Sequence, residues 1–456
     1  MKKSRRYIAA ASLLCLLILP VGACAPRYNV QLEKQPPPIP VPVPEVRQDT
    51  QTLVFVALSG GGTRAAAMSW KTLEVLKQIP YTYQDPSGRQ INSTLADEID
   101  YISGISGGSF AAAAWCLYKN NMEIFRRRFI ERDIQGELAM GLIIPPWQGL
   151  RLLSPEYDRI NMAAELYDRT VFEGKTFGDL PPHPVAWIHA THLALGDRFT
   201  FTPAFFNRLD SDLARYPIGY ACAASSAFPI LLSPLTVINY GEPVDLSKDI
   251  DYVMARRNAR NNIEKYFYAR MLEFYNDKRN RYMHLADGGL VDNQGLQAII
   301  DEFGTNGIIN KKLNDRDNPL KRLIIIDVNA GVLPDDKSSK SPGAPHISSV
   351  IEYTMVTSMD ILSAKRWMEI KALSQEIYKP AIDIGNQTRS LSLLEEPYTI
   401  EINFRNIKDP ALKARCYKLP TSFYLKQDQI KLIDTVVPSL IAEDPEMTRL
   451  KKALGD

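Results

Sequence analysis

Three short segments of this chain carry residues that together could catalyse acyl transfer. Ser106 lies in Gly104-Ile-Ser-Gly-Gly108, a G-x-S-x-G pattern typical of a sharp strand-to-helix turn that exposes a serine hydroxyl. Three consecutive glycines, Gly60, Gly61 and Gly62, follow an apolar strand-like run, and N–H groups at the start of a helix favour an anion. Asp287 precedes two further glycines that would hold its carboxylate in a turn. We therefore predict a nucleophile, an oxyanion site and a base.

The base is predicted to be the aspartate rather than a histidine. A serine hydroxyl needs a base within hydrogen-bond reach, and in hydrolases with this turn the histidine comes last in chain order. None of the five histidines lies in a suitable C-terminal loop: His183, His189, His192, His284 and His346. We interpret His284, three residues before Asp287, as a packed strand residue.

These motifs, in this order, resemble those of the patatin-like phospholipase family over about residues 52–330. The oxyanion loop is Gly60-Gly-Gly-Thr-Arg64, and Ala224-Ser-Ser-Ala-Phe-Pro229 resembles the family's A-S-x-A-x-P segment. Two positions depart from the common pattern, because Ser59 stands where many members carry Asp and Ala65 where Gly is frequent. Neither position is expected to act in the chemistry.

The resemblance implies a Ser106–Asp287 dyad that hydrolyses the ester of a phospholipid or a related lipid, without a metal or an organic cofactor. The oxyanion would be held by Gly60, Gly61 and Gly62, and Arg64 and Gly107 are candidate supporting residues. A carboxylate has an ordinary pKa near 3.9 and is a weak base at neutral pH. We therefore expect the site to raise the pKa of Asp287.

Each site residue also has a structural interpretation. Ser106 is a candidate helix N-cap and Asp287 a candidate turn aspartate. Arg64 has three alternative interpretations: it contacts a phosphate group, it supports the loop, or it is a solvated residue at a helix start. Asp292 and Asn293 are interpreted as loop structure. A phosphate-binding P-loop at the three glycines is disfavoured, because its lysine is missing.

The elements that must position these residues alternate between strands and helices. Strands are predicted at 53–58, 99–102, 184–193, 323–328 and 398–404, and helices at 64–79, 108–133, 350–377 and from about 425. This alternation predicts the α/β class, as a patatin-like α/β/α sandwich around a central, mostly parallel sheet with helices on both faces. Residues 134–160 and 240–282 are interpreted as insertions.

The domain prediction divides the chain into a catalytic part at residues 51–333 and a C-terminal extension at 334–456, packed on the core. The run 140–150 in the first insertion is apolar and carries Trp147. It is either a lid that contacts lipid or, as we prefer, packing of the insertion. We find no internal repeat.

The N-terminus predicts export and anchoring. Four basic residues precede an apolar run at 8–19 that suits a signal peptide and is too short to span a bilayer. Val21-Gly-Ala-Cys24 looks like a bacterial lipobox, which predicts a signal peptide at 1–23 and lipidation of Cys24; a plain signal peptide is the alternative. The proline-rich segment 24–50 is predicted to be a semi-rigid tether that holds the globular part a few nanometres from the lipid surface.

Composition bounds the remaining choices. The 456 residues are 45% hydrophobic and 23% charged, which is ordinary for a globular protein. Removal of residues 1–23 takes away four basic and no acidic residues, so the formal charge moves from +2 to −2, and no nucleic-acid partner is suggested. Cys15 belongs to the signal, and we interpret the others as small buried residues: Cys116, Cys222 and Cys416.

The leading hypothesis is a lipid acyl hydrolase anchored in a bacterial cell envelope. Ala25 after the lipidated cysteine favours the outer membrane, as expected for such lipoproteins. The alternative is a non-catalytic envelope lipoprotein that uses the same fold to bind lipid or a protein partner. The lipid head group, the ester position and the oligomeric state are left open.

Overall fold

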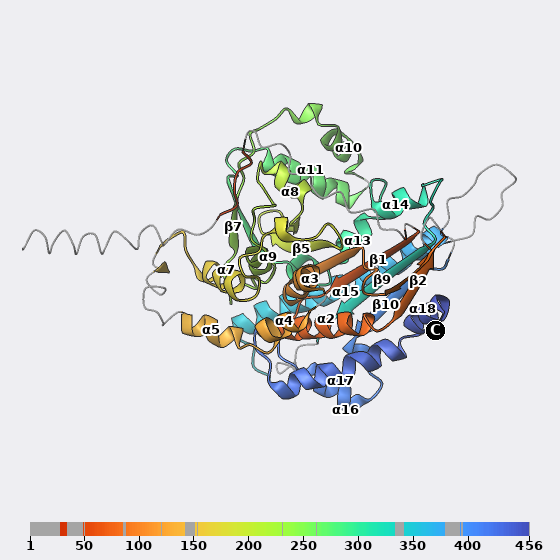
Figure 1. Ribbon diagram of the computed structural model, residues 1–456. Coiled ribbons are helices and arrows are strands. Elements are labelled where there is room, and N and C mark those ends of the chain that lie inside the picture. The colour runs from red at the N-terminus through yellow and green to blue at the C-terminus, as the bar shows by residue number, and fades with distance from the viewer. Residues whose placement is uncertain are drawn as a thin grey trace, which may run out of the picture.

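A central sheet with helices on both faces organises the molecule (Figure 1). The structure is a computed structural model that describes residues 28–33, 49, 51–84, 88–119, 121–141, 151–152, 154–229, 231–260, 262–332, 342–378, 393 and 395–455. The sheet has the strand order β10-β9-β1-β4-β5-β8-β7, with β6 paired to β5. Its strands are β1 Thr52–Leu58, β4 Tyr101–Ile105, β5 Val185–His192, β6 Asp197–Thr200, β7 Leu235–Ile238, β8 Tyr282–Asp287, β9 Arg322–Asn329 and β10 Tyr398–Asn403.

Five strands, from β10 to β5, pair in parallel, whereas β6, β7 and β8 join by antiparallel pairing. The predicted α/β class with a mostly parallel sheet is confirmed. The sequence predicted neither the antiparallel edge nor the hairpin of β2 (Pro80–Gln84) and β3 (Gln90–Thr94). Runs as short as β6 and β7 carry too little periodicity to be recognised in a sequence.

The helices have the following bounds: α2 Gly62–Leu76, α3 Gly107–Tyr118, α4 Glu123–Phe125, α5 Ile134–Gly141, α7 Arg159–Thr170, α8 Pro203–Arg208, α9 Ile218–Ser225, α10 Ile250–Asn258, α11 Ile263–Tyr275, α12 Gly289–Asp292, α13 Gln297–Asp301, α14 Ile308–Leu313, α15 Ile347–Tyr378, α16 Pro410–Tyr417, α17 Gln427–Glu443 and α18 Pro445–Leu454. The predicted helix at 108–133 is broken, because α3 ends at Tyr118 and a separate short helix follows. Both predicted insertions contain helices, among them α5, α10 and α11.

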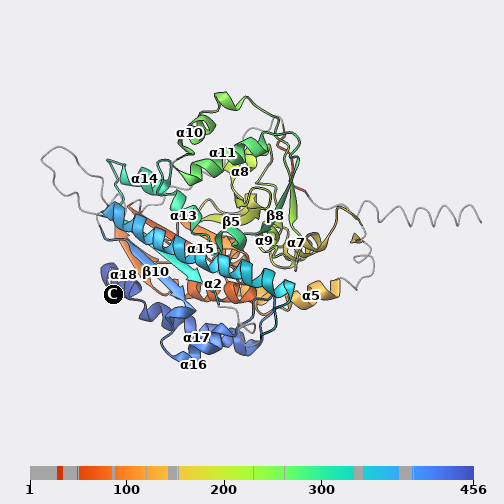
Figure 2. The ribbon, with the colours of Figure 1, turned by 180° about the vertical axis from the view of Figure 1, so that it is seen from behind.

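Alternation along the central strands assigns the two faces. Val54 and Val56 of β1 point into a core with α2, α3 and α17, and Phe55 points into a second core with α13 and α15, as the two-residue period of a strand requires. Figure 2 shows α15 crossing the face of the sheet opposite to α2. No helix in the described part of the chain is both long and apolar enough to cross a membrane.

The C-terminal residues continue the same sheet. Strand β10 pairs with β9 over six residues, from Tyr398 opposite Ile324 to Asn403 opposite Asn329. Helix α17 packs against α2, and α15 lies over α12 and α13. The segment predicted as a C-terminal extension therefore supplies an edge strand, and helices to both faces.

The structure differs from the predicted tether at residues 28–33, which pack against the globular part. Gln31 forms a β-bridge with Ser211, and the side chain of Asn29 is 2% exposed. The signal peptide, Cys24 and most of the proline-rich run lie outside the described residues. Figure 1 shows the docked residues beside β7, at the end of the molecule where α5 and α7 also lie.

Candidate active site

Ser106 occupies the turn between β4 and α3, as predicted from the glycine pattern. Its φ is 49°, a left-handed conformation that is rare for a residue with a side chain. Two contacts hold this conformation: the Ser106 N–H donates to Ser225 Oγ at 2.8 Å, and the Ser106 carbonyl accepts from Ser109 Oγ at 2.6 Å. The strained turn is thus supported from both sides.

The starts of α2 and α3 touch through their backbones. A Cβ added to Gly107 would lie 2.0 Å from the carbonyl oxygen of Gly62, and one added to Gly108 would lie 2.2 Å from that of Leu58. Only residues without a Cβ allow so close an approach. These glycines therefore bring Ser106 against the three-glycine turn that follows β1.

The three glycines of that turn do not have equivalent N–H groups. The Gly60 N–H donates to the Asn293 carbonyl at 2.8 Å, so it is engaged within the protein. Gly61 (φ 136°) and Gly62 (φ 61°) lie at the start of α2, where N–H groups have no acceptor within the helix. Gly61 and Gly62 remain the candidate oxyanion donors, and Gly60 shapes the turn.

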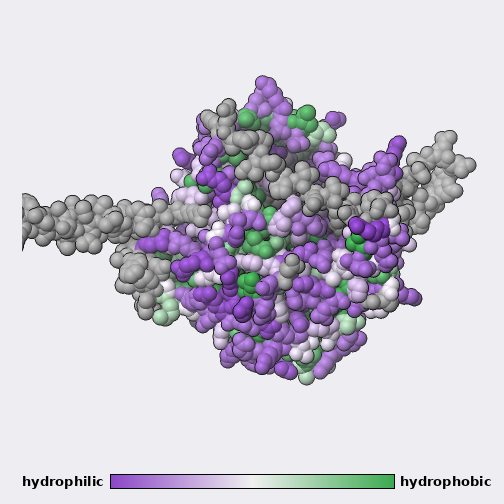
Figure 3. All heavy atoms as spheres, in the orientation of Figure 1, coloured by the Kyte–Doolittle hydropathy of each residue, from purple (hydrophilic) through white to green (hydrophobic). Residues whose placement is uncertain are grey.

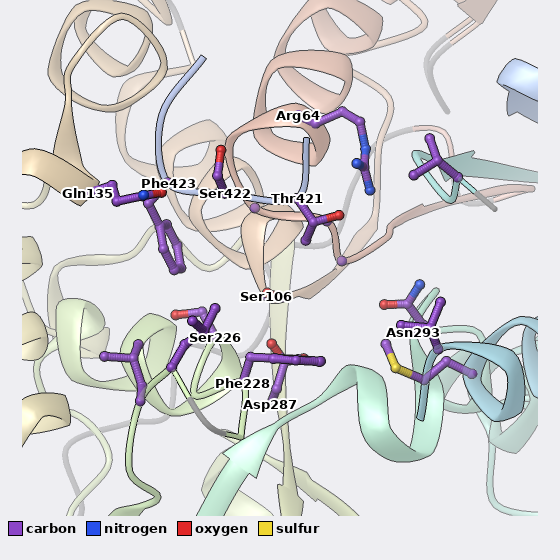
Figure 4. Close-up of a pocket in the computed structure, with 18 of the residues that line it drawn as sticks. Arg64, Ser106, Gln135, Ser226, Phe228, Asp287, Asn293, Thr421, Ser422 and Phe423 are labelled. Carbon is purple, nitrogen blue, oxygen red and sulfur yellow. The ribbon is translucent and has the colours of Figure 1, made fainter. Parts of the chain in front are cut away.

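Asp287 ends β8, and its backbone is fixed on both sides. Its N–H donates to the Ala227 carbonyl at 3.0 Å, and its carbonyl accepts from Thr191 Oγ1 at 2.8 Å. The carboxylate accepts the Gly289 N–H at 2.8 Å, and the Ser106 side chain lies close enough to lower its pKa. Figure 4 shows Ser106 and Asp287 facing one another.

Burial raises the pKa of Asp287 to about 6, although the Gly289 N–H and the Ser106 side chain act in the opposite direction. The side chain is 4% exposed, and transfer of a carboxylate out of water disfavours its charged form. This is the direction expected for an aspartate that must accept a proton near neutral pH.

Ser225 is a positioning residue that the sequence did not reveal. It ends α9 within the segment Ala224–Pro229; its hydroxyl holds the Ser106 N–H, and its carbonyl accepts from Gly288 at 3.1 Å. Two residues on, Ala227 holds the backbone of Asp287. This one segment therefore contacts both the predicted nucleophile and the predicted base. These contacts give a physical reason why the segment occurs together with the serine and aspartate motifs.

Arg64 is buried, so its interpretation as a solvated residue is wrong. The guanidinium donates to the carbonyls of Ala330 at 2.9 Å and Leu419 at 2.8 Å, and burial lowers the pKa of Arg64 to about 10. These bonds connect the glycine turn to the segment after β9 and to the C-terminal part. Arg64 also lines the cavity beside Gly61.

Asp292 and Asn293 both support the loop after Asp287. The Asp292 carboxylate accepts the N–H groups of Gly295 and Gln297 at 3.1 and 2.8 Å and lies 3.6 Å from Arg366. Asn293 holds Gly60 through its carbonyl, and its side chain reaches the cavity wall.

No histidine is among the described residues that line the cavity of Ser106 and Asp287. His189 is buried between Ser103 (3.0 Å from Nε2) and Thr200 (3.0 Å from Nδ1), and burial keeps its pKa well below the ordinary value. Because the Ser103 hydroxyl donates to the Gly295 carbonyl, it accepts from the ring, so His189 carries its proton on Nε2. His284 lies in β8, but its side chain is exposed and contacts Thr236, so its interpretation as a packed residue is wrong.

Ser106 and Asp287 open into a cavity of about 530 Å³, a volume typical of small-molecule sites. Apolar lining residues come from α5, α7 and the stretch before β7: Leu138, Ala139, Met162, Phe228, Leu231 and Leu232. The C-terminal segment completes the wall with residues from α15 and from the loop before α17: Val356, Met359, Asp360, Ser363, Thr421, Ser422 and Phe423. Figure 4 shows Phe423 and Gln135 on one side of Ser106 and Arg64 and Asn293 on the other.

No group of three or more His, Cys, Asp or Glu side chains arranged to hold a metal occurs within the described ranges. The cysteines predicted to be buried are so: Cys116, Cys222 and Cys416.

Residues 56–300 match the patatin-like phospholipase family. Among solved structures, human GIVD cytosolic phospholipase A2 is similar over 90% of this chain and 63% of its own, at 12% identity and a TM-score of 0.41. The complex of the same enzyme with methyl gamma-linolenyl fluorophosphonate is similar over 90% of this chain and 60% of its own, at 12% identity and a TM-score of 0.40. VipD from Legionella pneumophila is similar over 90% of this chain and 71% of its own, at 13% identity and a TM-score of 0.24. The chain thus spans less than two thirds of the human structures. No protein of curated function matches the sequence significantly.

We predict that Gly107→Ala separates the starts of α2 and α3, because the new methyl group would overlap the Gly62 carbonyl. The free energy of unfolding should fall by about 3 kcal/mol, the upper part of the range for overpacking, as measured by urea denaturation. Gly304→Ala is the control, since its Cβ meets only the Asp301 carbonyl, at 3.1 Å. Equal stability of the two variants would contradict the close contact.

A second prediction follows from the raised pKa of Asp287. The folded protein holds this proton more tightly than the unfolded chain, so its stabilising effect is full below about pH 4 and is lost as the pH rises through about 6. Asp287→Asn should therefore raise the free energy of unfolding at pH 8 by about 3 kcal/mol, the equivalent of two pKa units, and by much less at pH 4.

Urea denaturation at both pH values measures this difference. Asp292→Asn is the matched control and should lower stability at pH 8, because its carboxylate is hydrogen-bonded and lies near Arg366. A difference between wild type and Asp287→Asn that does not change with pH would show that Asp287 is not a buried titrating group.

Proposed function

The chain belongs to the patatin-like phospholipase family, and we propose that it is a serine acyl hydrolase acting on lipid esters through Ser106 and Asp287. The observation that carries this proposal is that Ser106, in its left-handed turn conformation, faces the buried carboxylate of Asp287, whose pKa burial raises. Both groups lie at one cavity beside a helix N-terminus. A nucleophile, a base and an anion-stabilising site thus occur together.

In the proposed reaction, Asp287 removes the proton from Ser106 as its oxygen attacks the ester carbonyl. The oxyanion of the tetrahedral intermediate is stabilised by the N–H groups of Gly61 and Gly62, and one such donor contributes roughly 2.7–4 kcal/mol. Protonated Asp287 then gives its proton to the departing alcohol oxygen. In the second half, Asp287 accepts a proton from the water that attacks the acyl-enzyme. It then returns this proton to the Ser106 oxygen as the fatty acid leaves.

The cavity suits a lipid substrate, since both apolar and polar residues line it. Met162, Phe228 and Leu232 would accept an acyl chain. Asn329, Thr421 and Ser422 would face the polar part of the molecule. A phospholipid or a related lipid ester presents both kinds of group to one site.

We extend the proposal to the location of the protein. The basic, apolar and lipobox segments at residues 2–24 support lipidation of Cys24, and Ala25 favours the bacterial outer membrane. An enzyme anchored in this way meets its substrate in or beside the bilayer that carries it. The competing proposal remains a non-catalytic envelope lipoprotein that binds lipid or a protein through this fold.

We predict that Ser106→Ala and Asp287→Asn each reduce fatty-acid release from phospholipid vesicles by at least roughly 1,000-fold, as loss of members of a catalytic unit does. Ser226→Ala and Asp360→Asn replace a hydroxyl and a carboxylate on the wall of the same cavity. These controls should stay within about tenfold of the wild type. Release of fatty acid is measured by mass spectrometry of extracted lipids.

A fluorophosphonate probe separates the enzyme from a binding protein. It should label wild type and fail to label Ser106→Ala, because only an activated serine reacts. Equal lipid hydrolysis by wild type and both dyad variants would overturn the mechanism. An unlabelled wild type that binds vesicles without hydrolysing them would favour the non-catalytic alternative.

A further inference from the structure

Residues 28–33, which follow Cys24 by a few positions, are docked on the globular part. The Asn29 amide donates to Ser211 Oγ and to the Ile238 carbonyl, both at 2.8 Å, and its oxygen accepts the Ile238 N–H at 2.7 Å. The Tyr240 hydroxyl donates to the Asn29 carbonyl at 2.8 Å. Asn29 is thus buried with every polar group of its side chain engaged, at the end of β7.

The rest of this docked segment (residues 28–33) is held by its backbone. The Val30 carbonyl accepts the Asp212 N–H at 2.9 Å, and the Leu32 N–H donates to the Asp210 carbonyl at 2.9 Å. These bonds join the segment to the loop after α8. A stretch with one buried anchor and a short strand-like pairing is a fixed part of the structure rather than a free tether.

The position of the docked segment limits the distance to the lipid anchor. Three residues separate Cys24 from Tyr28, and a fully extended chain of four Cα steps spans at most about 14 Å. If Cys24 is lipidated, as the proposed function holds, the membrane surface lies within that reach of Tyr28. The proline-rich run follows the docked segment and cannot lengthen this connection.

Tyr28 lies in a surface hollow next to the catalytic cavity. The hollow is lined also by Pro155, Leu193 and Tyr282. The two sites adjoin, because Asp158 lines the hollow and its neighbour Arg159 lines the cavity. The loop before β7 likewise contributes Leu232 to the cavity and Pro234 to the hollow.

Large apolar side chains are exposed around this junction. Leu231, which also lines the cavity, is 57% exposed, Tyr282 53% and Leu193 44%. We call these three residues the rim. Aromatic residues with a polar end favour the membrane–water interface, and exposed apolar groups that gather near a lipid-binding cavity suit contact with a bilayer.

We propose that the docked segment orients the enzyme, holding the rim and the adjoining cavity mouth against the bilayer that carries Cys24. This inference rests on the proposed lipidation and assigns the rim one occupant, the interfacial layer of that membrane. The lipid then reaches Ser106 from the anchored side, without release of the enzyme from the surface. The opposite end of the molecule, near α18, faces away.

Two insertions of the same length test whether the short connection between Cys24 and the docked segment orients the enzyme. Ten Gly/Ser residues between Arg27 and Tyr28 lengthen the chain between the anchor and the docked segment, by up to about 35 Å when extended. The same insertion between Glu33 and Lys34 lengthens only the chain that follows. In lipidated protein reconstituted in phosphatidylethanolamine–phosphatidylglycerol vesicles, only the first should move the rim from the lipid.

Rim contact is measured with a polarity-sensitive thiol probe at Tyr282→Cys and Leu193→Cys, with Lys452→Cys on α18 as the distant control. The native thiols of Cys116, Cys222 and Cys416 are buried, which raises the pKa of each and keeps them unreactive. Probes at 282 and 193 should report lipid and the probe at 452 water. The insertion before Tyr28 should abolish the difference, and that after Glu33 should preserve it.

Activity provides a second readout. The insertion before Tyr28 should lower the rate on vesicles about tenfold and leave the rate on a soluble short-chain ester unchanged, whereas the insertion after Glu33 should change neither. Asn29→Ala should act like the first insertion, because it releases the docked segment. Its melting temperature checks that the fold persists, and Glu33→Ala, at an exposed pair with Arg215, is its control.

The outcomes distinguish this inference from the proposed hydrolysis. If Ser106 and Asp287 do not act as proposed, esters remain intact, but the probes still report whether the rim touches lipid. Equal effects of the two insertions, or equal signals at positions 282 and 452, would overturn the orientation. Release of the wild-type protein from vesicles by a salt wash would overturn both anchoring and orientation.

Discussion

The backbone contact between the starts of α2 and α3 is the constraint on which the site depends. Gly107 packs against the carbonyl of Gly62 at a distance that excludes any side chain. This contact sets the Ser106 hydroxyl beside the free helix start at Gly61 and Gly62. Two further contacts hold the helix starts in this arrangement. Ser225 accepts the N–H of Ser106, and Arg64 binds the carbonyls of Ala330 and Leu419.

The carboxylate is maintained against an electrostatic cost. Burial of Asp287 disfavours its charge and raises its pKa to about 6, while its hydrogen bonds recover only part of that free energy. The cost is tolerated because the backbone of Asp287 is bound on both sides, to Ala227 and Thr191. This loss of stability is the consequence of a carboxylate whose pKa suits the role of base that we propose for it.

The sequence was informative wherever a glycine or a chain-order argument applied. The order of the glycine turn, the serine turn and the Asp-Gly-Gly segment predicted the family, and apolar runs predicted the central strands. The antiparallel strands β6 and β7 escaped notice because they are short, and Ser225 because its role depends on a contact across 119 residues. The sequence predicted a tether at residues 28–33 because prolines lie on both sides of this stretch. It could not show that Asn29 binds the end of β7, since that contact joins residues far apart in the chain.

The wall that the C-terminal segment contributes has a consequence for how such proteins can diverge. The groups proposed to act on the ester come from residues 61–287, whereas α15 and residues 421–423 contribute only to the wall of the cavity. Sequence changes after residue 340 can therefore alter which molecules fit without touching the reacting groups. Part of the cavity wall is therefore encoded in a stretch of the chain that supplies none of the reacting groups, and that part can change in evolution while the reacting groups are preserved.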